Sequence, residues 1–234
     1  MQNLQKSLSE TVYFVFKLAS KCWFCLSNPN IESHLIISVI SETYVTLAKG
    51  GLVDHHLLIV PIEHYSNSHQ IRTNGNDAFS KEVSKIEKQF DSYERKIGKC
   101  VISFESYGGS EANSNRIHHM HVQLVPIPIE AEINVEDDLK KEALNEGLEF
   151  SESFPSSPNS PFIKIGLVGK KSLYISPPKD SNGMSIPFNL TFGRYFLAKL
   201  MGTPLYADWK KCILEEPDEI KIVELLQKEN IFDS

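Results

Sequence analysis

The stretch "RIHHMHVQLVPIP" (Arg116–Pro128) places three of the eight histidines within four positions, at the start of an alternating apolar run that ends in prolines. Successive residues of an extended strand point to opposite faces. One face of this run therefore carries His119, His121 and Gln123, and the other face is apolar. His118 does not share the face of these three residues, and we expect it to have a lesser role in the chemistry of the site. The pattern predicts a strand with one chemically active face and one face in a core.

Composition limits the class of protein. The chain has 234 residues, of which 41% are hydrophobic, so it can bury one substantial core or two small ones. The apolar stretch Val12–Ser20 contains Lys17 and is too short for a bilayer span or a signal-peptide core. We therefore expect a soluble intracellular protein with no membrane partner.

Charge and histidine are distributed unevenly. Residues 1–129 hold 12 basic and 12 acidic side chains, whereas residues 130–234 hold 12 basic and 18 acidic ones. The net charge of −6 therefore comes from the second half, and broad electrostatic attraction to nucleic acid is not expected. All eight histidines lie between His34 and His121. The asymmetry indicates two functional halves, with imidazole chemistry in the first.

Periodicity predicts the elements of the first half. Short β-branched runs separated by turn residues predict five strands: 34–40, 43–48, 56–62, 100–107 and 119–128. Between the third and fourth strands, apolar residues spaced by three and four predict one amphipathic helix that ends at Gly98: Phe79, Val83, Ile86, Phe90, Tyr93 and Ile97. The order strands, helix, strands predicts an α+β layer with the helix packed against one face of an antiparallel sheet.

The second half reads as a smaller α/β module. An acidic helical segment is expected at 135–149, followed by the Ser/Pro loop Ser153–Pro161. Strands at 162–168 and 172–175 follow, then a helix at 191–201 and a C-terminal helix capped by Asp218. We divide the chain into 1–129 and 130–234 and expect the second part to pack onto the first.

The cysteine pair of "CWFC" leaves three interpretations open. Cys22 and Cys25 could be a redox pair, two buried thiols, or half of a tetrahedral zinc site completed by two histidines. No βαβ pattern follows to favour a thioredoxin-like site. A neutral imidazole on the neighbouring strand can attack phosphorus or ligate metal, and an amide can bind phosphate oxygens.

Several motifs together resemble a known family. His119 to Gln123 resembles the histidine-triad (HIT) signature in the His-x-His-x-Gln version of the nucleotidyltransferase branch. Other stretches look like the C-terminal CwfJ family of spliceosome-associated proteins: "CWFCLSNP", "HLIISV", "GGLVDHHLLIVPIEHYSN" and "HHMHVQLVPIP". Three later stretches look like the second C-terminal module of the same family: "FGRYFLAKLMGTP", "DWKKC" and the closing "IFD". The resemblance runs from Cys22 to Asp233 and implies a HIT-like sheet.

This resemblance implies roles for individual residues. It places Cys22, Cys25, His64 and His119 at structural zinc-binding positions, and His121 at the position of the nucleophile.

Gln123 is assigned to the same site and stands where the signature usually has its third histidine. That departure weakens the case for rapid hydrolysis and remains compatible with nucleotidyl transfer.

Phosphate or RNA contacts are expected from Asn115, Arg116 and Arg194, although a loop amide, a solvated cation and a surface ion pair are the plainer readings. His34, His55 and His56 begin predicted strands and are more often structural; His55 or His56 could face the site.

The resemblance implies a nuclear protein associated with late spliceosomes or the debranching machinery. Our first hypothesis is a module that binds branched or structured intron RNA and assists lariat turnover. The alternative is an enzyme of the HIT type that hydrolyses or transfers a nucleotide through His121. An open pocket of phosphate size at His121 would favour the enzyme, and an occluded one the binding module.

Overall fold

Eight short strands, rich in β-branched residues, pair antiparallel in one sheet. The computed structural model describes residues 22–109, 119–155, 160–183, 186 and 189–232. The strand order across the sheet is β1-β2-β3-β5-β4-β7-β8-β6. The strands are β1 (Ile36–Val39), β2 (Thr43–Leu47), β3 (Leu57–Pro61), β4 (Lys99–Tyr107), β5 (Val122–Pro128), β6 (Glu149–Ser151), β7 (Phe162–Leu167) and β8 (Leu173–Ser176).

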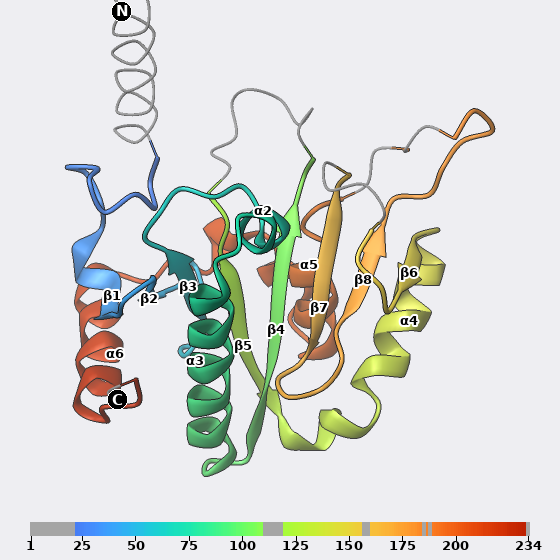
Figure 1. The fold of residues 1–234 in the computed structure, drawn as a ribbon. Coiled ribbons are helices and arrows are strands. Elements are labelled where there is room, and N and C mark those ends of the chain that lie inside the picture. Colours follow the sequence, from blue (N-terminus) through green and yellow to red (C-terminus); the bar gives the residue numbers. More distant parts are fainter. Residues whose placement is uncertain (1–21, 110–118, 156–159, 184–185, 187–188, 233–234) are drawn as a thin grey trace, which may run out of the picture.

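Helices cover both faces of the sheet, α3 in front and α5 behind it in Figure 1. The α-helices in the described ranges are α2 (Ser68–Thr73), α3 (Asp77–Arg95), α4 (Val135–Asn145), α5 (Phe192–Leu200) and α6 (Glu216–Lys228). Short 3-10 turns are η1 (Ser33–Leu35), η2 (Ile129–Ile133), η3 (Pro204–Ala207) and η4 (Trp209–Lys211). The α+β class is therefore confirmed. None of these helices has the length and apolar character that crossing a membrane requires.

Helix α3 forms where its apolar spacing predicts it. The Asn76 side chain caps the helix by accepting a hydrogen bond from the backbone N–H of Phe79. Phe79 and Phe90 are buried in the core that α3 shares with the sheet. The prediction was wrong at the C-terminal end, because the helix stops at Arg95 and Ile97 is 54% exposed. The turn after the helix uses the positive φ of a glycine and leaves Ile97 outside the apolar stripe.

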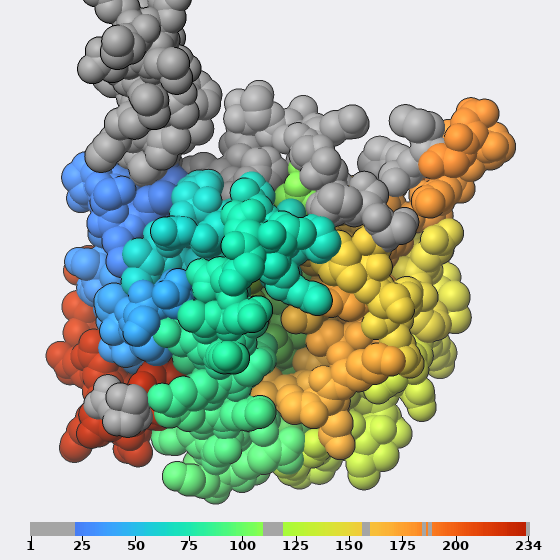
Figure 2. All heavy atoms as spheres, in the orientation of Figure 1, coloured from blue at the N-terminus to red at the C-terminus, as the bar shows by residue number. Residues whose placement is uncertain are grey.

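The two halves share one sheet. Strand β4 pairs with β5 of the first half on one side and with β7 of the second half on the other. Helix α6 then returns to β1 and η1 at the opposite edge, where Val223 and Leu226 join the α3 core. Figure 2 shows the red residues near the C-terminus lying against the blue residues of the first half. The second half therefore packs extensively on the first, and the division at residue 129 stays a prediction.

Some predicted boundaries were wrong. Strand β5 begins at Val122, so His119 and His121 lie in the segment that precedes it. The backbone N–H of Met120 donates to Tyr65, which lies beyond the end of β3, so no regular ladder forms here. Helix α6 is capped at Glu215 and contains Asp218 in its first turn, where a carboxylate complements the helix dipole. The short elements α2 and β6 were not predicted.

Candidate functional site

Four side chains from distant parts of the sequence bring their donor atoms together. The sulfur and ring-nitrogen atoms of Cys22, Cys25, His64 and His119 all lie within 4.8 Å of one another. Cys22 Sγ is 3.3 Å from His119 Nδ1, and Cys25 Sγ is 3.3 Å from His64 Nδ1. These are the residues predicted to bind metal.

The local backbone explains this convergence. Residues 22–28 form successive tight turns, in which the Asn28 side chain donates to the Cys22 carbonyl at 2.8 Å. The Tyr44 hydroxyl on β2 ties the same turn to the sheet by donating to the Phe24 carbonyl at 2.6 Å. Because β3 and β5 are paired neighbours, the chain just after β3 and the chain just before β5 meet at one end of the sheet. His64 and His119 occupy these two places.

The donor set fits a tetrahedral metal ion. With zinc–sulfur and zinc–nitrogen bonds of about 2.3 and 2.0 Å, neighbouring sulfur and nitrogen ligands of a tetrahedron lie roughly 3.5 Å apart. The observed separations between cysteine sulfur and histidine Nδ1 are 3.3–3.6 Å. His119 Nε2 donates to the Pro61 carbonyl at 2.9 Å, which leaves Nδ1 as the lone-pair donor facing the cysteines. Burial lowers the pKa of His119 to about 4, so the imidazole is neutral, as a ligand must be.

His121 lies two residues further and is directed away from this cluster, into a pocket. Its Nδ1 is 3.1 Å from the His119 carbonyl, to which only an N–H can donate, so Nε2 carries the free lone pair. The Phe24 ring packs on the imidazole with the two centroids 4.9 Å apart. The ring of His121 is therefore held in one tautomer by a residue of the donor cluster.

The pocket next to His121 has a volume of about 790 Å³ and is open to solvent. It covers the face of β1, β2 and β3 opposite α3, and its walls are mainly apolar: Trp23, Phe24, Ile31, Leu35, Leu58 and Trp209. Polar groups converge on it from His56, His121, Gln123 and Arg194. Apolar walls with a few convergent polar groups are typical of small-molecule and nucleotide sites of this size.

His56 is fully buried at this pocket. Its Nδ1 accepts a hydrogen bond from the backbone N–H of Leu52 at 3.1 Å, so Nε2 carries the hydrogen. Nε2 has no hydrogen-bond partner among the described residues, and a buried donor left unpaired costs about 1–3 kcal/mol. The Gln123 side chain lies beside the His56 ring and favours the protonated form of the imidazole, but no hydrogen bond of normal geometry joins the two side chains. Burial, reinforced by the charge of Arg194, lowers the pKa of His56 to about 3.

Arg194 reaches the pocket from α5 in the second half. Its Nε and Nη2 atoms donate to the carbonyl groups of Gly50, Tyr206 and Ala207 at 2.7–3.1 Å. All of these acceptors are neutral. Arg194 thereby joins the second half to the first half at Gly50. Burial lowers the pKa of the guanidinium from its ordinary value.

The remaining predicted residues lie elsewhere. Asn115, Arg116 and His118 fall outside the described residues. His34 pairs with Glu219 of α6 at 3.0 Å, and His55 pairs with the fully buried Glu94 of α3 at 2.6 Å. Both of these histidines hold helices to the sheet.

Sequence reasoning missed two features of the site. The Pro61 carbonyl, which orients His119, carries no side-chain signal in the sequence. Trp209 of η4 reaches the pocket only because the second half folds back over the first, and the "DWKKC" stretch alone gave no indication of that contact.

Comparison with known proteins identifies one family and several relatives that are similar to this chain. The family described as "Protein similar to CwfJ C-terminal" matches residues 15–139. Zinc finger CCCH domain-containing protein 59 of Oryza sativa subsp. japonica is 31% identical over 217 residues, which cover 89% of this chain and 34% of that protein. Human CWF19-like protein 1 is 29% identical over 89% of this chain and 37% of its own length. CWF19-like protein mug161 of Schizosaccharomyces pombe is 28% identical over 85% and 35%.

The chain thus spans about a third of the length of these relatives. Among solved structures, yeast Ap4A phosphorylase Apa2 in complex with AMP aligns over 83% of this chain and 78% of that one, with 13% identity and a TM-score of 0.36. A similarity of that size supports no statement about fold or function. The family match covers more than half of the sequence, and the chain therefore belongs to the CwfJ C-terminal family.

Proposed function

We propose that this protein is a HIT-type nucleotidyl hydrolase or transferase that acts on a phosphate-bearing nucleotide of RNA through His121. The observation that carries the proposal is the open pocket of about 790 Å³ at His121, because an occluded histidine would indicate a binding module without chemistry. Ligand pockets of roughly 300–1,000 Å³ accommodate molecules of nucleotide size. Trp23, Phe24 and Trp209 offer aromatic surface for a base.

The geometry of His121 supports nucleophilic chemistry. Its Nδ1–H is held by the His119 carbonyl, so the lone pair on Nε2 is free to attack phosphorus. The attack forms a phosphorus–nitrogen bond, and the bond from phosphorus to the leaving oxygen breaks with its electron pair staying on that oxygen. Water, or an acceptor hydroxyl, then displaces His121 from phosphorus and gives up its proton. The leaving oxygen takes up a proton in the first step.

A structural zinc ion is part of this proposal. Cys22, Cys25, His64 and His119 are the residues that would hold it. When bound, it would fix the turn that bears Phe24 and the segment that bears His121. Through the His119 carbonyl, the site sets the tautomer of the nucleophile without touching the substrate.

Family membership suggests where the reaction takes place. The match to the CwfJ C-terminal family and the relatives named CWF19-like support a splicing-related role, and we propose that role, in the nucleus, for this chain. Its substrates would be branched or structured intron RNA, and its partners late spliceosome or debranching proteins. The net charge of −6 means that RNA affinity must come from a few local contacts.

A second candidate function is an RNA-binding module without catalysis. It is favoured by Gln123, which lines the pocket where the HIT signature has its third histidine. An amide can bind phosphate oxygens but cannot transfer a proton at neutral pH.

Trapping a covalent intermediate tests the enzyme proposal. Incubation with radiolabelled dinucleotide, capped or branched RNA substrates is expected to yield an acid-labile, base-stable phosphoramidate on the protein. His121→Ala should abolish the adduct while zinc content stays unchanged. His69→Ala is the matched control, because His69 stacks on Phe154 and does not line the pocket. No adduct with any of these substrates would favour the binding module.

RNA binding makes a separate prediction for Arg116, which precedes the histidine segment. Arg116→Glu is expected to weaken binding of branched RNA several-fold without changing thermal stability, with a salt dependence reduced by about one unit of slope. Fluorescence anisotropy at several salt concentrations measures both. Unchanged affinity in this variant would mean that Arg116 does not contact RNA.

A further inference from the structure

The buried imidazole of His56 carries a hydrogen-bond donor that the chemistry proposed for His121 does not use. The Nε2–H of His56 is completely buried and unpaired among the described residues, and the Leu52 backbone fixes it as a donor. His56 lies on the same face of the sheet as Gln123, because its neighbour Leu58 is the register partner of Gln123. The structure therefore places a fixed donor in the pocket beside Gln123, and no described residue accepts from it with normal hydrogen-bond geometry.

A second group in the same place has an unbalanced charge. The guanidinium of Arg194 is anchored by three neutral carbonyl groups and forms no ion pair with a carboxylate of the described residues. The Cys212 thiol lies 3.5 Å from Nη2 of Arg194 and favours the charged form of the guanidinium. Asp208 also favours the charged form, but its carboxylate forms no ion pair with Arg194. A buried cation with only neutral partners is stabilised by an added anion.

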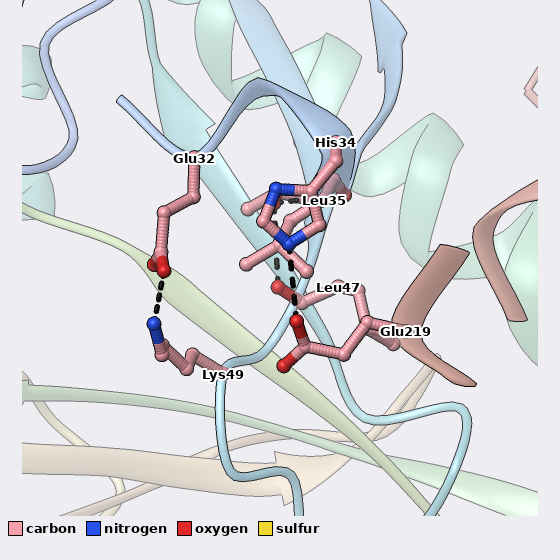
Figure 3. Close-up of polar contacts among 7 residues, drawn as sticks. Glu32, His34, Leu35, Leu47, Lys49 and Glu219 are labelled. Carbon is pink, nitrogen blue, oxygen red and sulfur yellow. Dashed lines mark hydrogen bonds and ion pairs between the residues drawn. The ribbon is translucent and has the colours of Figure 1, made fainter. Parts of the chain in front are cut away.

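The other charges around the pocket do not supply that anion. Figure 3 shows Glu32 paired with Lys49 at the rim, and both residues line the pocket. The same view shows Glu219 of α6 directed to His34, next to Leu35. Glu32 is the carboxylate among the residues that line the pocket and is already paired with Lys49, so no carboxylate of the pocket lining forms an ion pair with Arg194.

We propose that His56 and Arg194, together with the amide of Gln123, form an anion site that binds a phosphate group of the substrate, with Arg194 supplying from the second half the positive partner that the HIT signature lacks at Gln123. This inference rests on the proposed function and deepens it. It names His56 as a phosphate-binding residue and makes the pocket a joint product of both halves. It also defines the ligand class as phosphorylated nucleotides, with unphosphorylated nucleosides binding much more weakly.

Inorganic phosphate and AMP are the probes that test this site, with binding measured by isothermal titration calorimetry on the zinc-loaded chain and adenosine as the uncharged comparison. Arg194→Gln is expected to weaken phosphate and AMP binding by about tenfold or more, as loss of a charge-assisted hydrogen bond does. Lys199→Gln is the matched control, because Lys199 lies on the same helix and pairs with Glu142 outside the pocket. It should bind both probes as the parent does.

Two substitutions of His56 separate anion binding from a structural role. His56→Asn keeps an acceptor near the Leu52 N–H and removes the donor in the pocket, whereas His56→Gln keeps a donor near the Nε2 position and loses that acceptor. If the imidazole binds phosphate, the Gln variant should retain affinity and the Asn variant should lose about fivefold to tenfold. If His56 has only a structural role, the Asn variant should be more thermally stable than the Gln variant, and the two variants should bind the probes equally.

The outcomes also separate this inference from the proposed function. Phosphate binding with the expected variant pattern, but no covalent adduct, would sustain the anion site and reject the enzyme. The anion site is overturned if the parent binds neither phosphate nor AMP, or if the two His56 variants bind both probes equally. The His56 pair decides the matter even if Arg194→Gln fails to fold.

Discussion

Purified protein is expected to contain about one zinc ion per chain, and its removal should destabilise the fold more than any single core substitution. The four donor atoms come from the 22–25 turn, the segment after β3 and the segment before β5, so the ion would join three segments that are far apart in the sequence. In small zinc domains the metal contributes on the order of 10 kcal/mol, against about 1 kcal/mol for a typical substitution.

Substitution of the cysteines tests this expectation. The Cys22→Ser, Cys25→Ser double variant should lose the metal and unfold at much lower temperature, as measured by elemental analysis and calorimetry. Cys212→Ser is the control, since that thiol lies outside the donor cluster, beside Arg194. Full zinc occupancy in the double variant would show that the metal is bound elsewhere.

The second large effect is expected at Gly50, where the two halves meet. Gly50 has φ +64, and a Cβ there would lie 2.2 Å from the Trp209 carbonyl oxygen. Its own carbonyl accepts from Arg194 at 2.7 Å. Gly50→Ala therefore forces η4 away from the pocket in addition to the conformational cost of about 1–2 kcal/mol for a side chain at positive φ. We expect a total loss above about 3 kcal/mol in the free energy of unfolding.

Gly75 provides the comparison for this prediction. It has φ +76, but a Cβ there meets nothing within 4 Å. Gly75→Ala should therefore cost only the conformational part, about 1–2 kcal/mol. Urea denaturation of both variants measures the difference, and phosphate affinity should fall in Gly50→Ala alone. Equal losses of stability would mean that the contact of Gly50 with η4 does not hold the halves together.

Most of the fold was predictable because its signals are local. The β-branched runs and the stripe of α3 locate elements whose burial requires only one face of a strand or helix. The errors occur where tertiary contacts override the local pattern. Helix α2 is six residues long and depends on the cap from Asn67, and β6 has three exposed residues and forms only because β8 lies beside it.

The site was predictable only in part. The spacing of Cys22 and Cys25 and the alternation around His121 are visible in the sequence, and the family resemblance supplied His64 and His119. The role proposed for His56 depends on a backbone N–H four residues away and on a donor left unpaired by folding. Its neighbour Arg194 comes from the second half, and no local pattern in the sequence records that proximity.

A crystal structure of the zinc-loaded protein with AMP tests the central claim most directly. The account predicts the base against the aromatic wall that includes Phe24, and the phosphorus within about 3.5 Å of His121 Nε2. It further predicts phosphate oxygens within hydrogen-bond distance of His56 Nε2 and the guanidinium of Arg194. AMP bound outside this pocket, or bound within it with its phosphate turned away from His121 and Arg194, would contradict the account.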